Sequence, residues 1–449
     1  MLTKVFSDYG MVLVLIVLCA LFSVLTLNEQ TPTDSDAIAE LLGEITGEFD
    51  RSAVILVVGE ANKGSGPFAE KLREELVRAG YDDARVVVGI PRDLRVALDE
   101  MKAKGERPAV IATSGDARKW GVIEGIGVRY PEFSGCEVLW PESYIWPDFL
   151  KRSNLLAIVD RIVVIAVIAI GMTMVIITAG IDLSVGSLIA LAAVISTLVM
   201  KRLGGLEAPA AAVAVGFVAG ILCCGVIGAL GGFIVARFKV APFITTLGVM
   251  MMARGLAFMI TGGFSIYQVP RALPWLGQGS SLGVPNTVIL LVVLYVLAHV
   301  FMTHTRYGRY IYAVGGNEEA ARLSGVPVRW VIVLVYIFSS LAAGLGGCIQ
   351  ASQLNTGTPS IGMMYELYVI AAVVVGGTSL SGGSGRILGT LIGAFIISVI
   401  QNGMNLLGME SYTQQIVLGA VILGAVLLDK VRSTGAVPGF LSRKKKTSD

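Results

Sequence analysis

The feature that most constrains this chain is the succession of long apolar runs that fills it from residue 155 onward. Each run approaches the length of about 20 residues that a helix needs to cross the hydrocarbon core of a bilayer. Together with an earlier run, Met11–Leu27, they predict an all-α multi-pass membrane protein with about ten transmembrane helices. The later spans are expected near residues 157–179, 184–200, 208–235, 242–261, 286–303, 330–350, 364–376, 386–402 and 413–428.

Composition excludes several other classes of protein. Of the 449 residues, 54% are hydrophobic and only 15% are charged, which is typical of an integral membrane protein and not of a soluble core. The 54 glycines fit closely packed membrane helices. Five scattered cysteines and two histidines form no disulfide framework and no metal-binding spacing. We therefore expect no metal site, and no nucleic-acid partner.

The first apolar run also resembles the hydrophobic part of a signal peptide. However, only Lys4 precedes it as a cation, and no small-residue cleavage site follows it clearly. We interpret residues 1–27 as a retained first span.

Residues 28–153 differ in charge from the rest of the chain. They hold 23 acidic and 16 basic side chains, a net charge of −7, whereas the remainder carries +9. The block therefore predicts a separate soluble domain. Short apolar runs typical of buried strands alternate with segments whose apolar residues have the spacing of a helix. This order indicates a small α/β domain with a mostly parallel sheet. The expected strands begin at Ala53, Ala84 and Pro108, and the expected helices are 66–80, with Phe68, Leu72, Leu76 and Val77 on its inner face, and 92–104.

Two loops of this insert lie where related folds bind ligands. Gly59–Gly66 follows a strand, but Lys63 is on the wrong side for a Walker A sequence. Thr113–Asp116 follows another strand at its carboxyl end. We interpret the insert as a degraded or purely structural domain.

Basic residues set the expected orientation in the membrane. With the N-terminus inside, the cytoplasmic segments hold fourteen cations, and the external segments other than the insert hold three. The positive-inside rule then places both termini in the cytoplasm and residues 28–153 outside. Residues 154–430 form the remaining transmembrane domain, and residues 431–449 form a basic cytoplasmic tail.

The polar stretch from Tyr312 to Trp330 lies between two apolar spans on the predicted cytoplasmic side. Asn317 is expected to cap a short helix, with Glu318 and Glu319 in its first turn, where the helix dipole favours carboxylates. Gly325 is expected to end that helix. Such a helix could be pushed by another protein, although an ordinary polar connector remains an alternative.

Two similar polar motifs interrupt the spans, Gly180–Ser187 and Gly377–Ser384. They share five of eight positions, which is either a faint internal repeat or chance. A carboxylate at a span boundary is costly unless it is paired or hydrated, so Asp182 is a functional candidate. The alternative is that Asp182 or Ser184 caps the next helix. Glu366 is expected to line a path, to pair with Arg254, or to lie at the interface. The path and helix-break candidates are Asp182, Ser184, Glu366, Thr378 and Ser379.

Five blocks in order carry a family resemblance over about residues 155–430. They are Gly180–Ser187, Ala241–Gly248, the 312–330 loop, Ile370–Arg386 and Asn402–Gly408. The chain resembles the ribose-type ABC transporter permeases, the membrane subunits of bacterial sugar importers; the insert lies outside the resemblance. The ATPase-coupling loop that the resemblance implies comprises Gly315, Gly316, Asn317, Glu318, Glu319, Ala321, Arg322, Leu323, Ser324 and Gly325.

The resemblance implies a permease that moves a monosaccharide or similar solute by alternating access in the bacterial inner membrane. The expected partners are a second permease subunit, identical or not, a cytoplasmic ABC ATPase and an external substrate-binding protein. The chain has no nucleotide-binding motif, so it is expected to be no enzyme and to bind no cofactor, with ATP and Mg held by the ATPase. Tyr368 and Gly231 replace an Asp and an Asn of the family pattern, which puts the substrate in doubt.

Two other functions stay open from the residues. One is a stand-alone secondary transporter or channel, for which Asp182 and Glu366 are weak ion-coupling candidates. The other is a membrane-anchored sensor or enzyme whose external α/β domain carries the activity. A further hypothesis is that the insert docks or replaces the external binding protein.

Overall fold

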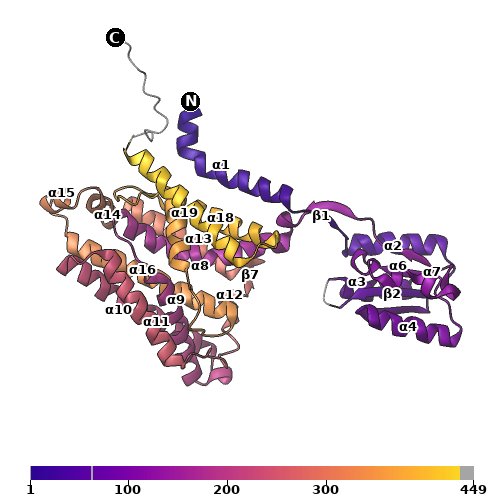
Figure 1. Cartoon of the computed structure of the whole chain (residues 1–449). Coiled ribbons are helices and arrows are strands. Elements are labelled where there is room, and N and C mark those ends of the chain that lie inside the picture. The colour runs from indigo at the N-terminus through magenta and orange to yellow at the C-terminus, as the bar shows by residue number, and fades with distance from the viewer. Residues whose placement is uncertain (1, 62–63, 435–449) are drawn as a thin grey trace, which may run out of the picture. The chain divides into compact units, whose positions relative to one another are not determined.

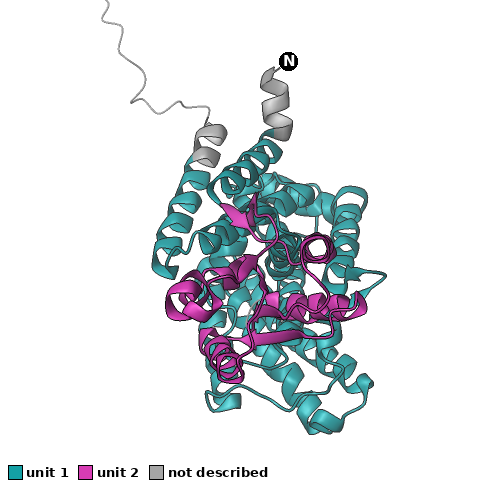
Figure 2. Cartoon of the chain, turned by 90° about the vertical axis from the view of Figure 1, so that its right-hand side faces the viewer, with its two compact units in different colours: residues 1–26, 149–449 teal, residues 27–148 magenta. Residues whose placement is uncertain are grey.

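The computed structural model describes residues 2–61 and 64–434. The chain divides into a helical unit, Met1–Thr26 with Phe149–Asp449, and an α/β unit, Leu27–Asp148 (Figure 2). The tail expected at 431–449 lies outside the described residues from 435 onward. Phe149 begins the return to the helical unit, because its ring stacks on Phe22 with centroids 6.1 Å apart. Residues 149–153, which the sequence assigns to the insert, thus belong to the helical unit.

The α/β unit is built on a four-stranded parallel sheet of strand order β3-β2-β4-β5. The three strands expected from the apolar runs form as predicted, and Pro91 begins a helix because its fixed φ suits the first turn. The elements of this unit are β1 Leu27–Gln30, α2 Ser35–Glu48, β2 Ile55–Glu60, α3 Ser65–Arg78, β3 Ala84–Gly89, α4 Pro91–Lys104, β4 Val110–Thr113, α5 Gly115–Arg118, α6 Gly121–Glu124, α7 Ile126–Arg129, a 3-10 turn Pro131–Phe133, β5 Glu137–Leu139 and β6 Tyr144–Pro147.

Side chains alternate across the strands and cover both faces of this sheet. Ile55 and Val57 point to the face covered by α2 and α3, while Leu56 and Val58 point to the face covered by α4 and the short helices after β4. Both faces are therefore buried, as parallel sheets require. Val77 is exposed and does not join Phe68, Leu72 and Leu76 in the core, so its predicted place on the inner face of α3 is wrong.

The described residues of the helical unit form seven helices long and apolar enough to cross a membrane, and three shorter apolar helices. Their ends fall within a few residues of the expected spans (Figure 1). The elements are α1 Leu2–Leu25, a 3-10 turn Asp148–Leu150, α8 Arg152–Ile177, α9 Val185–Arg202, a 3-10 turn Gly205–Glu207, α10 Ala210–Phe238, α11 Pro242–Thr261, α12 Pro274–Gly277, β7 Ser280–Ser281, β8 Val284–Pro285, α13 Asn286–His304, α14 Arg306–Gly316, α15 Glu318–Leu323, α16 Val328–Leu354, α17 Tyr365–Val375, α18 Ile387–Leu406 and α19 Ser411–Thr434.

Burial separates central helices from peripheral ones. α8, α9 and α18 are mostly buried, whereas α10, α11 and α13 expose most of their apolar side chains. A helix that is apolar all round and buried belongs to the centre of a bundle, and an exposed apolar face suits lipid. The central helices therefore hold the segments most able to line a path.

Glycines on α10 allow it to approach α16 closely. Gly228 and Gly232 face Tyr336 and its neighbours on α16, and a Cβ on Gly228 would lie 2.6 Å from the carbonyl oxygen of Tyr336. Small residues at such spacing are how membrane helices bring their backbones together.

Gly228→Ala is expected to lower the free energy of unfolding by about 1–3 kcal/mol, because the added methyl overpacks the helix contact. Gly248→Ala on α11 is the matched control, since no atom lies within 4 Å of the added Cβ. The control should leave stability unchanged or raise it slightly, since alanine favours helix. The thermal unfolding midpoint in detergent measures both. An equal midpoint for the two variants would contradict the proposed packing.

Candidate coupling segment and helix breaks

The polar stretch between α13 and α16 folds as two consecutive helices, of which the sequence predicts only the second. α14 ends where Asn317 takes an extended φ of −161°. The Asn317 side chain then accepts a hydrogen bond of 2.9 Å from the backbone N–H of Ala320, which caps α15 as predicted. Gly325, with φ of +83°, follows the end of α15. One asparagine thus fixes the corner between the helices.

α15 is held by one buried side chain, and its other side chains are exposed to solvent. Ala321 is buried, while Leu323 is 79% exposed. Glu319 and Arg322 form an exposed ion pair one turn apart, and the hydrogen bond from Arg322 lowers the pKa of the Glu319 carboxyl. The exposed surface of α15 therefore presents an apolar side chain beside a charged pair.

The last turn of α14 touches the end of α8 and the second polar motif. A Cβ on Gly315 would lie 2.7 Å from the backbone N of Gly383 and nearer still to the carbonyl oxygen of Ile177. The N–H of Gly383 donates to that same oxygen at 2.9 Å. The Tyr312 hydroxyl adds a hydrogen bond of 2.9 Å to the carbonyl of Gly385. The end of α14, the end of α8 and the 376–386 loop therefore form one joint.

The first helix break is organised around Asp182, which is buried. One carboxylate oxygen accepts from the Ser184 N–H at 3.0 Å and from the Ser184 hydroxyl at 2.6 Å. The other accepts from the Ser339 hydroxyl of α16 at 2.7 Å. The expected capping of α9 is wrong, because the cap residue Ser184 makes no side-chain hydrogen bond to that helix. Asp182 instead ties the unwound segment to α16.

The second helix break lies between α17 and α18. Gly377, Gly382 and Gly383 have positive φ, and Ser379 N–H donates to the Ser384 carbonyl at 3.1 Å across a tight turn. Thr378 is buried, and within the described part of the chain its hydroxyl has no hydrogen-bond partner. A buried hydroxyl without a partner is costly, which keeps Thr378 a candidate for contact with a solute.

Arg254 and Glu366 meet at the start of α9 without forming the expected direct ion pair. Arg254 donates to the carbonyls of Pro359 at 2.9 Å, Ile361 at 2.7 Å and Gly186 at 3.3 Å. The Glu366 carboxylate lies against the Cα of Gly186. The half-buried Glu366 is therefore beside the first turn of α9, where the helix dipole favours a negative charge.

The two departures from the family pattern lie in different environments. Tyr368 is half-buried on α17, with its ring 6.2 Å from that of Tyr365. A Cβ on Gly231 would meet only a Val249 methyl at 3.7 Å, an ordinary contact, so a larger residue is sterically acceptable there.

Sequence reasoning missed Ser339 and the backbone role of Arg254. Ser339 is one of two adjacent serines inside an apolar span, which is a weak signal that a polar partner faces that span. The carbonyls that Arg254 binds leave no signal in the sequence.

Asn317→Ala is expected to weaken α15 by about 1 kcal/mol through loss of its cap. The Ala320 amide should then exchange its hydrogen about five-fold faster. Asn317→Asp keeps the acceptor and should behave as the unchanged protein. Hydrogen-exchange mass spectrometry of this segment measures the effect, and equal exchange in Asn317→Ala would contradict the capping role.

Comparison with known proteins assigns the helical unit to a family. Residues 154–426 match the family described as the permease component of the branched-chain amino acid transport system. The chain belongs to this permease family. The α/β unit lies before the matched region.

The permease is also similar to individual sugar transport proteins. It is 46% identical over 292 residues to the ribose import permease protein RbsC of Escherichia coli K12, covering 64% of the permease and 88% of that protein. It is 43% identical to RbsC of Bacillus subtilis 168, covering 65% and 89%. It is 36% identical to the D-allose transport system permease protein AlsC of E. coli K12, covering 64% and 86%. No solved structure matches the permease.

Proposed function

We propose that the chain is the membrane permease subunit of an ATP-driven ABC importer for a monosaccharide or related small polar solute. The observation that carries the proposal is the likeness of its helical unit to relatives named for ribose, D-allose and L-arabinose transport. It performs no covalent chemistry. ATP and Mg are held by a separate ATPase, and the chain binds no cofactor.

The proposed topology has ten spans. The seven long helices and the three shorter apolar ones supply them. In this proposal both termini lie on the cytoplasmic side of a bacterial inner membrane and the α/β unit lies outside, which the distribution of basic residues supports. α17, with 11 residues, extends only about 16 Å, so at least one of its ends lies within the membrane.

The proposed mechanism is alternating access driven from α15. The ATPase binds α15 through Glu319, Arg322 and Leu323. When ATP drives the ATPase to close, the movement of α15 displaces α14. Gly315 transmits that movement to the end of α8 and to the 376–386 loop, because the backbones touch there. The broken helices that follow change the opening of a path beside Asp182, Ser184, Glu366, Thr378 and Ser379.

The proposed assembly contains two permease subunits, identical or not, a cytoplasmic ATPase and an external substrate-binding protein. The exposed apolar faces of α10, α11 and α13 are available for lipid or for the second subunit.

Uptake of radiolabelled D-ribose, D-allose and L-arabinose by the native host tests the proposal. Cells with the chromosomal copy deleted should lose uptake of one of these sugars, and a plasmid copy should restore it. Depletion of cellular ATP while the membrane potential is maintained should abolish the restored uptake. Uptake that persists without ATP would favour a secondary transporter. Unchanged uptake of every sugar in the deletion strain would overturn the proposed substrate class.

A further inference from the structure

The α/β unit contains a cavity of about 240 Å³ at the carboxyl edge of its sheet. Gly115 follows the carboxyl end of β4, and Trp140 follows that of the adjacent parallel strand β5. Sheets of this kind bind their ligands outside the carboxyl ends of the strands. The cavity therefore lies at the position where sheets of this kind bind ligands.

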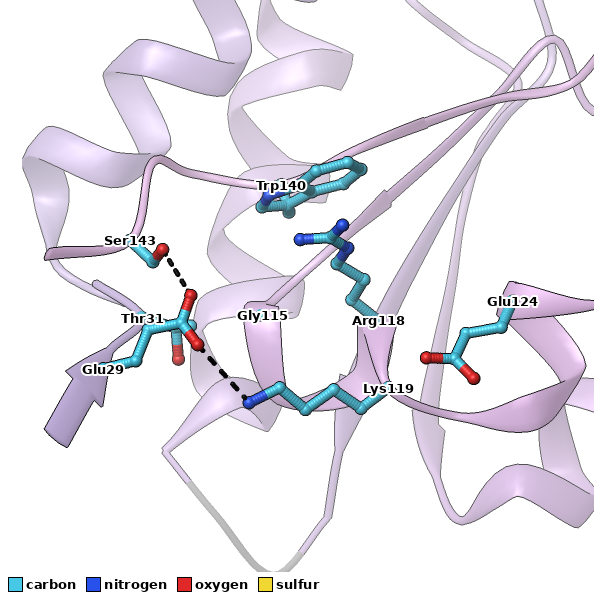
Figure 3. Close-up of a pocket in the computed structure, with 8 residues that line it drawn as sticks. All are labelled: Glu29, Thr31, Gly115, Arg118, Lys119, Glu124, Trp140 and Ser143. Carbon is cyan, nitrogen blue, oxygen red and sulfur yellow. Dashed lines mark hydrogen bonds and ion pairs between the residues drawn. The ribbon is translucent and has the colours of Figure 1, made fainter.

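Four segments of the unit bring polar groups to this cavity. Figure 3 shows Arg118 lying against Trp140 and Lys119 reaching towards Glu29. The guanidinium carbon of Arg118 is 3.6 Å from the centre of the Trp140 ring. The eight lining residues are Glu29, Thr31, Gly115, Arg118, Lys119, Glu124, Trp140 and Ser143.

The wall beside β4 depends on the glycine at position 115. A Cβ there would overlap the Thr31 side chain, so the segment after β1 packs directly on the start of α5. The same segment brings Glu29 to the cavity, where its carboxylate accepts a 2.6 Å hydrogen bond from the Ser143 hydroxyl and pairs with Lys119 at 3.8 Å. These two partners lower the pKa of the Glu29 carboxyl, so it stays ionised at neutral pH.

The charges that line the cavity cancel. Glu29 and Glu124 offer acceptors, and Arg118 and Lys119 offer donors. Stacking on Trp140 orients the guanidinium of Arg118, and within the described residues its N–H groups make no hydrogen bond. An anion would be attracted by two of these side chains and repelled by the other two. A hydroxyl group both donates and accepts, so a neutral ligand with several hydroxyls satisfies both kinds of partner.

We propose that this cavity of the α/β unit binds a small neutral polyhydroxylated molecule, of the size and chemistry of a monosaccharide. Arg118 and Lys119 donate to its hydroxyl oxygens, the carboxylates of Glu29 and Glu124 accept from its hydroxyls, and the Trp140 indole holds the Arg118 guanidinium in place. The insert is then a ligand-binding domain and not a purely structural one. The proposal depends on the proposed transport function only in the choice of sugars used as probes.

Equilibrium binding of radiolabelled D-ribose to the purified full-length chain in detergent, with no partner protein present, tests this site. D-allose, L-arabinose, a panel of other pentoses, hexoses and sugar alcohols, and inorganic phosphate as the anionic probe are each labelled and measured in the same way. We expect saturable binding of at least one neutral sugar. Arg118→Ala should weaken it about ten-fold or more, as loss of a hydrogen bond from a charged group does. Arg92→Ala, exposed on α4 and away from the cavity, should leave it unchanged.

Glu124→Gln is a second variant for the same binding experiment, to be used if Arg118→Ala unfolds the α/β unit. Glu124 is exposed, so its replacement should leave the thermal unfolding midpoint unchanged while it weakens sugar binding. Full affinity in Glu124→Gln, or binding of phosphate in place of every sugar, would overturn the proposal. So would the failure of every sugar to bind. Uptake by cells distinguishes the failure of this site from the failure of the proposed transport function. If no sugar binds to the purified chain but cells still take up sugar, only the site is contradicted. If a sugar binds but cells lacking the chain take up sugar normally, only the transport function is contradicted.

Discussion

Gly315→Ala is expected to reduce solute uptake about ten-fold or more. The added Cβ would collide with the backbones of Ile177 and Gly383, which no change of side-chain rotamer relieves. Overpacking of this kind costs about 1–3 kcal/mol, and a coupling energy of that size changes an equilibrium about 5- to 150-fold. The joint at Gly315 is a direct route by which the proposed push from α15 reaches the end of α8 and the 376–386 loop.

Gly316→Ala is the matched control for this variant. It makes the same replacement on the next residue of α14, where no atom lies within 4 Å of the added Cβ. Uptake, measured with radiolabelled sugar at equal amounts of membrane-inserted protein, should stay close to that of the unchanged chain. Equal uptake in the two variants would show that the contact at Gly315 does not transmit the movement.

Asp182→Ala is expected to lower the free energy of unfolding by about 3 kcal/mol and to abolish uptake. The change removes three hydrogen bonds to a buried carboxylate and leaves the hydroxyls of Ser184 and Ser339 without that acceptor. Thermal unfolding in detergent and uptake in cells measure the two effects. Ser381→Ala, at an exposed position of the second break, should change neither.

A double-mutant cycle shows whether Asp182→Ala acts through its hydrogen bond with Ser339 or through a general loss of packing. Ser339→Ala alone removes one of the three hydrogen bonds, so its cost should not add to that of Asp182→Ala. Additive costs would contradict a direct link between the first break and α16.

The positions of the membrane helices could be predicted from the sequence because a span is specified by its own residues. Pro242 begins α11, and the apolar run that follows ends at Thr261, as the sequence predicts. Asn317 as the cap of α15 was predictable for the same reason, since a cap and its helix are neighbours in the chain.

The contacts that join distant segments could not be predicted in this way. Ser339 lies 157 residues from Asp182, and nothing in either neighbourhood specifies the other. α14 was missed because its arginines, glycines and tyrosines lack an apolar period long enough to indicate a helix. The cavity of the α/β unit was missed because β5 has three residues and because Glu29 joins it from before the domain's first predicted strand.

Copurification of an ATPase with the tagged chain tests the central claim most directly. In detergent extracts of the native host, an ABC ATPase should copurify with the unchanged chain and be at least about ten-fold depleted with the double variant Glu319→Arg and Arg322→Glu, because the docking charges are then reversed. Glu75→Arg with Arg78→Glu, which reverses a similar exposed pair on α3, should retain the ATPase. An unchanged chain that brings down no ATPase, or a reversed α15 that retains it, would contradict the account.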